Sequence, residues 1–405
     1  MSGHPPPASP PAGGTPPSGT RSVRAPPLDG AASFCALGSD PAAIAPALAG
    51  ARAAVPAPSA AVVFASGPLA ELGDKTLLLL REQFGDIPIV LGSSPGVLTE
   101  RAEHEGTSAL SGLVWRGGGV MPIFVSPKTA IDEIGSKVAK QVATALGDAP
   151  GTVILLAQPQ GFSPHTLDEL ARFSAHATVI GGGTLPGGAF VCSPDRKPAV
   201  GAVVGLVVRG IARPAVRTAA ACRLLAPFAP ITEARGAMVF RIGEGPALEA
   251  LSASTRDLAG RPLVLAVIAE PERSTGPRSG VLVRGIRGID PGRKSVVVTD
   301  EVAPGMLMSF AVCDGSASRA ELAASVRELG RQLAGAAPQF GLLMSCAGRG
   351  MGLYGERDVD TRIVRERFPN VPFAGMFSTF EIGPLGMRPA MHLYTSVVAM
   401  FGTPS

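Results

Sequence analysis

The sequence predicts an α/β fold built from repeated α-β-α-β units, which form two related halves with mixed sheets. The first observation is that an apolar run followed by small turn residues recurs near positions 60, 152 and 341. A second apolar run follows each time after about thirty residues, which is the size of one β-α-β crossover. The second observation is that FGDIPIVLGSS and FPNVPFAGMFS are similar enough to indicate a duplication.

The first unit is predicted from an apolar run at 61–64, which ends in the turn sequence Ala-Ser-Gly. A helical stretch continues through 77–84, and the second apolar run at 86–94 ends in Gly-Ser-Ser. A further apolar strand at 109–115 closes the unit. Short apolar runs bounded by Gly, Pro and Ser are typical of buried strands.

The second unit repeats this order of elements. Four aliphatic residues behind Pro127 share one helical face: Ile131, Ile134, Val138 and Val142. Pro164 lies at the first position of the next helix, where its missing N–H costs nothing. The strands of this unit are predicted at 152–156, 179–183 and 200–208.

The third unit is predicted in the C-terminal part of the chain. Its preceding helix is expected to begin at a capping box made by Ser318 and Glu321. The strands are predicted at 341–346, 370–375 and 395–401. Between the second and third units, residues 222–312 are interpreted as a degenerate unit in which a loop at 270–280 replaces the middle helix.

This organisation divides the chain into three segments. Residues 1–32 are rich in Pro and Gly with almost nothing to bury, and such a segment is predicted to be a disordered tail. Residues 33–210 form the first predicted α/β domain, and residues 222–405 form the second.

The composition excludes several classes of function. The net charge is only +4, and one Trp with two Tyr provides no aromatic platform, so a nucleic-acid partner is not expected. No apolar run approaches the roughly 18 residues of a membrane span, and the start of the chain lacks the apolar core of a secretory signal. The five cysteines contain no C-x-x-C pair, which argues against a zinc site and favours a reduced protein in the cytoplasm.

Two glycine-rich segments resemble catalytic or nucleotide-binding motifs only superficially. Residues 92–96 match G-x-S-x-G, but Pro95 lacks the backbone N–H that the oxyanion hole of that motif requires. Residues 181–188 do not match G-x-G-x-x-G, and no helix N-terminus follows them to bind a pyrophosphate. We therefore expect neither a serine hydrolase nor a nucleotide site.

The densest set of polar residues follows the two apolar runs of the third unit. Residues 345–350 and 378–384 each leave a predicted strand, and ligands of parallel sheets bind at such carboxyl ends. Two alternatives remain open for Arg349 and Glu381: a structural ion pair, or a clamp that holds the carboxylate and the ammonium of a zwitterion. Cys346 is expected to line the floor of that site.

The segments GLLMSCAGRGMGLYGE, IVRERFPNVPFAGMFSTFEIGP and MHLYTSVVAMF resemble the C-terminal domain of the FIST family. The segments VVFASGPL, IPIVLGSSPGVL and VIGGGTLPGG resemble its N-terminal domain. The resemblance implies a sensory, ligand-binding protein of signal transduction, with haem and nitric oxide as ligands of one subgroup. The chain has Thr379-Phe380 where a small Ala-Gly pair is expected, so the phenyl ring could fill the pocket or tilt Glu381.

The resulting prediction is a stand-alone sensory protein that binds a small metabolite, such as an amino acid, and signals through a separate protein partner. It is expected to have no catalytic residue, no metal and no cofactor. One alternative is a haem-binding gas sensor with His392 as the axial ligand, and another is an enzyme with Cys346 as the nucleophile. The predicted ligand-binding residues are Ser345, Cys346, Gly348, Arg349, Ser378, Glu381 and His392.

Overall fold

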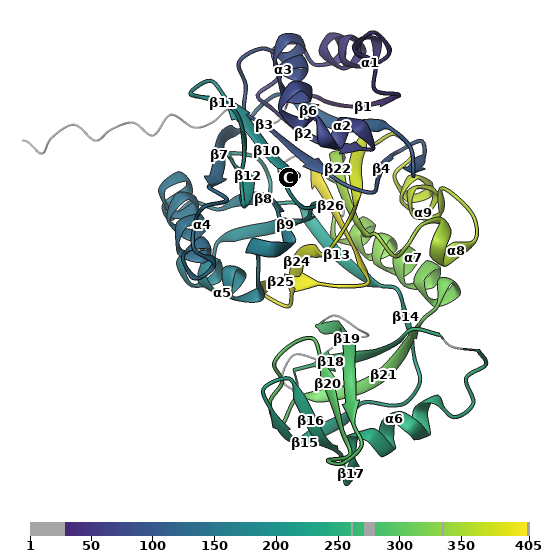
Figure 1. Ribbon diagram of the computed structural model, residues 1–405. Helices are drawn as coiled ribbons and strands as arrows, with labels where there is room; N and C mark the ends of the chain where they lie inside the picture. Colours follow the sequence, from purple (N-terminus) through teal and green to yellow (C-terminus); the bar gives the residue numbers. More distant parts are fainter. Residues whose placement is uncertain (1–28, 261, 271–279, 334–335, 403–405) are drawn as a thin grey trace, which may run out of the picture.

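The computed structural model describes residues 29–260, 262–270, 280–333 and 336–402. These residues form a body of three mixed six-stranded sheets and a smaller lobe with a barrel-like sheet (Figure 1). The predicted α/β class with mixed sheets is therefore confirmed. The predicted N-terminal tail lies outside the described residues as far as residue 28.

The body consists of three repeats with the same order of elements, where the sequence predicted two related halves. The first repeat contains β1 (Ala31–Leu37), α1 (Pro41–Ala54), β2 (Ala60–Ser66), α2 (Pro68–Glu71), α3 (Gly73–Phe84), β3 (Ile89–Ser93), β4 (Gly96–Thr99), β5 (Glu103–Glu105) and β6 (Ala109–Trp115). The second contains β7 (Gly119–Val125), α4 (Ile131–Leu146), β8 (Gly151–Ala157), a 3-10 turn (Pro159–Gly161), α5 (Pro164–Phe173), β9 (Ala177–Gly183), β10 (Ala189–Ser193), β11 (Arg196–Val200) and β12 (Val203–Arg209).

The third repeat begins with β13 (Ala215–Ala220) and is then interrupted by the lobe. It resumes with α7 (Gly315–Gln332), β22 (Pro338–Cys346), α8 (Met351–Tyr354), α9 (Val359–Arg367), β23 (Phe373–Ser378), β24 (Glu381–Leu385), β25 (Arg388–His392) and β26 (Thr395–Gly402). Helix α7 starts one turn before the predicted capping box, because the Asp314 carboxylate caps it by accepting from the backbone N–H of Ala317 at 2.8 Å. Ser318 is instead buried and bonds to the Tyr354 hydroxyl.

Each sheet combines four strands of its own repeat with a hairpin from another repeat. The first sheet has the order β1-β6-β2-β3-β10-β11, so its hairpin comes from the second repeat. The second sheet ends in β24-β25 from the third repeat, and the third sheet ends in β4-β5 from the first. Among the described strands, one parallel pair per sheet joins the two central strands of one repeat: β2 with β3, β8 with β9, and β22 with β23.

The three sheets share one central core, and the helices cover the outside (Figure 1). Side chains from all three sheets meet there; the Trp115 and Phe340 rings stack at 5.5 Å, and the Phe340 and Phe401 rings at 4.3 Å. A separate apolar layer lies between each sheet and its own helices. Strands that are apolar on both faces explain the unbroken hydrophobic runs of the sequence.

The lobe comprises residues 222–313 and is inserted between β13 and α7. Its elements are β14 (Cys222–Leu224), β15 (Ala229–Arg235), β16 (Met238–Ile242), β17 (Gly245–Pro246), α6 (Ala247–Thr255), β18 (Val264–Ala269), β19 (Val281–Asp290), β20 (Ser295–Val298) and β21 (Leu307–Cys313). Strand β21 pairs with β15 on one side and β18 on the other, which closes the ring of strands. The interpretation as a degenerate α/β unit is wrong, since the pairings among the lobe's described strands are all antiparallel.

Candidate functional site

The two predicted loops of the third repeat leave neighbouring strands, as the sequence predicted. Strands β22 and β23 are parallel, and their last residues, Cys346 and Ser378, are partners in the register. The backbone N–H of Ala347 donates to the carbonyl of Ser378 at 2.8 Å, which joins the two strand exits. The predicted residues of both loops therefore lie at one edge of the third sheet.

Arg349 is paired with Asp360 of α9, and not with Glu381. Its Nε lies 2.8 Å from Asp360 Oδ2 and its Nη2 lies 2.9 Å from Oδ1, a bidentate ion pair in which neither side chain is exposed. The alternative of an Arg349–Glu381 ion pair is therefore wrong. The position that a ligand carboxylate would take on the guanidinium is already occupied by Asp360.

A buried hydrogen-bond network surrounds this ion pair. Tyr354 donates to Asp360 Oδ1 at 2.7 Å and accepts from Arg349 Nη2 at 2.6 Å, while Ser345 Oγ donates to Asp360 Oδ2 at 2.6 Å. Ser396 contributes a further hydroxyl 3.0 Å from that of Ser345. Burial opposes ionisation of Asp360, but the charge and hydrogen bonds of Arg349 hold the pKa of its carboxyl below the ordinary value.

Glu381 is the buried acid at the other side of the strand exits. The hydroxyl of Ser378 donates to Oε1 at 2.9 Å. Within the described part of the chain, Oε2 has no hydrogen-bond partner. Burial raises the pKa of Glu381 well above its ordinary value, which favours the protonated form of the carboxyl group.

Cys346 lies beside Glu381, beneath an exposed turn. Its side chain is buried, whereas the next two residues, Ala347 and Gly348, are exposed. Burial raises the pKa of the Cys346 thiol to about 12, with the neighbouring Glu381 as the second cause. The sulfur is therefore a protonated, weakly nucleophilic thiol at neutral pH.

The ring of Phe380 lies away from Glu381. Phe380 directly precedes β24, and its side chain packs with Ile382 in the apolar layer between the second sheet and its helices. There it stacks on Phe162 with the ring centroids 5.2 Å apart. The substitution of a phenylalanine at this position therefore does not fill the space beside the Glu381 carboxyl.

His392 is opposite Glu381 in the β24–β25 hairpin, and it is almost completely buried. Its Nε2 lies 3.4 Å from the carbonyl of Gly383, and burial together with the nearby Arg284 lowers its pKa to about 4. These surroundings do not fit an axial haem ligand, because Nε2 points into the hairpin's own backbone.

The lobe touches the body at the same hairpin. Arg284 of β19 is buried, binds Asp300 at 2.8 Å, and donates to the carbonyl of Met391 at 3.2 Å. Arg388 of the hairpin forms an ion pair with Glu270 of the lobe. The hairpin that carries Glu381 and His392 is thus also the element against which the lobe rests.

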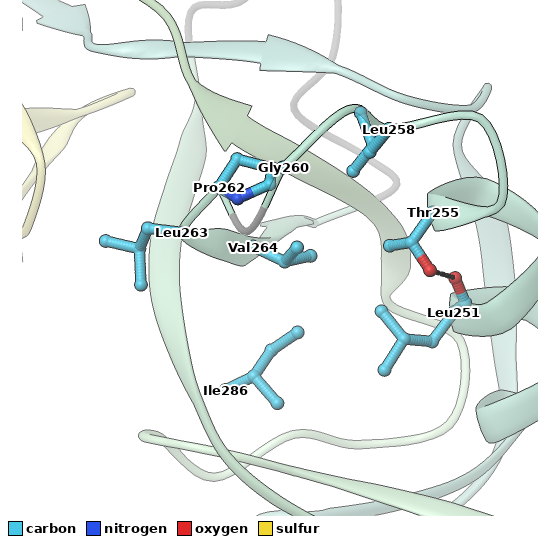
Figure 2. A pocket seen from close by; sticks show the side chains of 8 residues that line it. All are labelled: Leu251, Thr255, Leu258, Gly260, Pro262, Leu263, Val264 and Ile286. Atoms are coloured by element: carbon cyan, nitrogen blue, oxygen red, sulfur yellow. Dashed lines mark hydrogen bonds between the residues drawn. The ribbon is translucent and has the colours of Figure 1, made fainter.

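A pocket in the lobe was not predicted from the sequence. It has a volume of about 620 Å³ and lies between the end of α6 and the strands β18 and β19 (Figure 2). The residues that line it are mostly aliphatic: Leu251, Leu258, Pro262, Leu263, Val264 and Ile286. The hydroxyl of Thr255 is directed to the carbonyl of Leu251 and not into the pocket. Sequence periodicity could not reveal it, because its walls come from three separate elements.

Glu103 is a second buried acid that the sequence analysis missed. The exchanged hairpin β4–β5 brings it to the start of α9, where Oε1 accepts from the backbone N–H of Thr361 at 2.8 Å. Burial, with the charge of Asp360 as the next cause, raises the pKa of Glu103 to about 7. An acid that begins a short strand in the segment TERAEHEG gives no sequence signal for burial.

The raised pKa of Glu103 predicts that the free energy of unfolding depends on pH. In the folded state Glu103 keeps its proton up to about pH 7, whereas in the unfolded state it releases the proton near pH 4.5. The stability that this proton contributes to the folded state is therefore fully present below pH 4.5 and is lost as the pH rises through 7. The unfolding free energy should fall by roughly 3 kcal/mol over this interval, and Glu103→Gln should remove that fall. Urea titrations from pH 4.5 to 8 measure it, with the exposed Glu133→Gln as the matched control. Parallel curves for wild type and Glu103→Gln would contradict the prediction.

Two further properties concern the described residues as a whole. None of their helices combines the length and the apolar character needed to cross a membrane. No group of three or more His, Cys, Asp or Glu side chains in those residues is placed to hold a metal ion.

Comparison with known proteins places the chain among sensory proteins. The model of the FIST N domain matches residues 59–244, and that of the FIST C domain matches residues 247–384, so the two matches meet inside the lobe. FIST domains are sensory domains of signal transduction. The chain is 27% identical to the uncharacterized protein Rv0628c of Mycobacterium tuberculosis over 259 residues, which are 61% of this chain and 67% of the relative. It is 28% identical to the uncharacterized protein Mb0898c of Mycobacterium bovis, with the same coverage.

Proposed function

This chain belongs to the FIST family, and on that premise we propose that it is a cytoplasmic sensory protein that binds a small amine-bearing metabolite. An amino acid is the first candidate. Binding, without catalysis, would alter the contact between body and lobe, and a separate protein partner would receive the signal. The ligand would bind at the exits of β22 and β23, and Arg349 would position the site without contacting the ligand's carboxylate.

The observation that carries the proposal is the carboxyl group of Glu381. It is fully buried next to the exposed turn at 347–348, and its Oε2 has no hydrogen-bond partner within the described residues. A buried polar atom without a partner is costly, and a ligand that supplies the partner recovers that cost. An amine is the suitable partner: it is an ammonium ion at neutral pH, and once the Glu381 carboxyl releases its proton to solvent the two groups form an ammonium–carboxylate pair.

Arg349 is proposed as a positioning residue and not as the ligand's carboxylate partner. Its ion pair with Asp360 fixes the turn that begins at Cys346, because Arg349 lies within that turn. Ser345 belongs to the same network and orients Asp360, while Ser378 orients Glu381. Gly348 keeps the turn small above Cys346, which would be a neutral contact for the ligand.

The chemistry of the site supports binding over catalysis. A nucleophilic cysteine needs a thiolate, and the pKa of Cys346 near 12 keeps the thiol protonated at neutral pH. Transmission to the lobe is supported by the bonds of Arg284 and Arg388, which tie the hairpin of Glu381 to the lobe.

A thermal-shift plate of amino acids, primary amines and amine-free analogues tests this proposal. A ligand at about a hundred times its Kd should stabilise the protein by about 2.7 kcal/mol, which raises Tm by a few degrees. The matching α-hydroxy acid should give no shift, and the affinity should rise with pH because Glu381 must lose its proton.

The variant Glu381→Gln should abolish this shift while it leaves the protein folded. Glu103→Gln is the matched control, since it also replaces a buried glutamate whose second oxygen lacks a hydrogen-bond partner among the described residues. It should respond to the ligand like the wild type. If Glu381→Gln keeps the shift, or if amine-free analogues shift Tm equally, the proposed ligand site is wrong.

A further inference from the structure

The chain enters and leaves the lobe along two adjacent strands, which we call the neck. Strand β14 leads into the lobe directly after β13, and strand β21 leads out of it directly before α7 (Figure 1). The two strands are antiparallel, and the first residue of β14, Cys222, is the register partner of the last residue of β21, Cys313. Two cysteines therefore face each other at the base of the lobe.

The hydrogen bonds of the neck define the type of this cross-strand pair. The backbone N–H of Asp314 donates to the carbonyl of Ala221, and that of Leu225 donates to the carbonyl of Phe310. Hydrogen-bonded pairs alternate with pairs that exchange no hydrogen bond, so Cys222 and Cys313 form a pair of the second kind. The Cα atoms of such pairs are about 4.5 Å apart, and disulfides span Cα separations of about 4.4 to 6.8 Å.

The surroundings of the two thiols also suit a bond between them. Both side chains lie in the same apolar cluster of the lobe, as expected for directly opposite residues of an antiparallel pair. Cys222 is buried, whereas Cys313 is half-buried and can be reached from solvent. Burial raises the pKa of the Cys313 thiol and the charge of Arg349 opposes this, so reaction should become faster as the pH rises above neutrality.

We infer that Cys222 and Cys313 form a reversible disulfide that closes the neck of the lobe. The oxidant is a low-molecular-weight disulfide of the glutathione class. The Cys313 thiolate attacks one of its sulfurs and releases one small thiol; Cys222 then attacks the sulfur of Cys313 and releases the second. The two protein thiols lose two protons and two electrons, and the small disulfide is reduced to two thiols.

The bond would change the mechanical link between lobe and body. It would enclose the whole lobe in one covalent loop, which limits the unfolded conformations available to that segment. It would also hold β14 and β21 together, so the two strands of the neck could not separate while the bond is intact. This device is independent of the ligand proposed for Glu381, because neither cysteine belongs to that site.

The experiment uses the full chain, incubated at pH 8 with oxidised glutathione in its native state and then alkylated. Peptide mapping without reduction should show a Cys222–Cys313 cross-link, with the loss of two hydrogens and full reversal by dithiothreitol. The oxidised protein should also resist limited proteolysis within the lobe. A Cys313 that remains glutathionylated, pairs with Cys346, or is alkylated in full would overturn the inference.

Single cysteine-to-alanine variants test the disulfide independently. Cys222→Ala and Cys313→Ala should each abolish the cross-link and the proteolytic resistance. Cys35→Ala is the matched control, since Cys35 is also half-buried on a strand, and it should retain both effects. Peptide mapping of the oxidised wild-type protein requires no variant. It therefore tests the Cys222–Cys313 disulfide even if Cys222→Ala fails to fold.

Discussion

Replacement of Asp360 by asparagine is expected to lower the free energy of unfolding by about 3–5 kcal/mol. The physical reason is that the Arg349 guanidinium would remain fully buried with its charge uncompensated. The hydroxyl groups of Ser345 and Tyr354 would also lose their charged acceptor. Urea denaturation at pH 7, followed by circular dichroism, measures the change.

The matched control for Asp360→Asn is Glu356→Gln. Glu356 is exposed and pairs with Arg319 and Arg362 at the surface, where ion pairs contribute little, so this variant should unfold like the wild type. The double variant Arg349→Met with Asp360→Asn should lose less stability than the sum of the single variants, since no unpaired buried charge remains. Additive losses would show that the pair does not act as one unit.

Replacement of Gly375 by alanine is expected to have an effect of similar size. Gly375 lies in β23 opposite Leu343 of β22, and a Cβ atom built on it would lie 1.9 Å from the Leu343 carbonyl oxygen. This contact is with backbone in the central parallel pair, so no side-chain rotation relieves it. We expect a loss of about 3 kcal/mol or more in the free energy of unfolding.

Gly352→Ala is the control for this substitution. Gly352 lies in helix α8, and a Cβ atom there would have nothing within 4 Å. Alanine favours the helix by up to about 1 kcal/mol over glycine, so stability should stay the same or rise slightly. Thermal denaturation of both variants makes the comparison, and an equal Tm for Gly375→Ala and Gly352→Ala would contradict the proposed clash.

Local patterns predicted the repeats because each central strand is apolar on both faces and ends in small residues. They also predicted that Glu381 and the turn at 345–350 would meet, since parallel neighbours leave the sheet at one edge. Asp360 escaped notice because an acid in the first turn of the polar helix α9 looks like an exposed helix-terminal residue. Only the packing of α9 against β22 reveals it as the partner of Arg349.

The exchange of hairpins could not be predicted from the sequence. A hairpin is a local signal, but the edge on which it docks is set by the packing of three sheets around one core. The lobe was misread for a related reason: strands such as β15 and β19 are only partly buried, so the segment resembles a weakened α/β unit. The closing pair, β18 with β21, joins segments far apart in the chain.

The three repeats depend on one another in a closed cycle, because each sheet is completed by a hairpin from another repeat. The first repeat needs strands from the second, the second from the third, and the third from the first. A fragment that stops between the repeats would leave unpaired strand edges, which are prone to aggregation. The body is therefore expected to fold and unfold in one cooperative step.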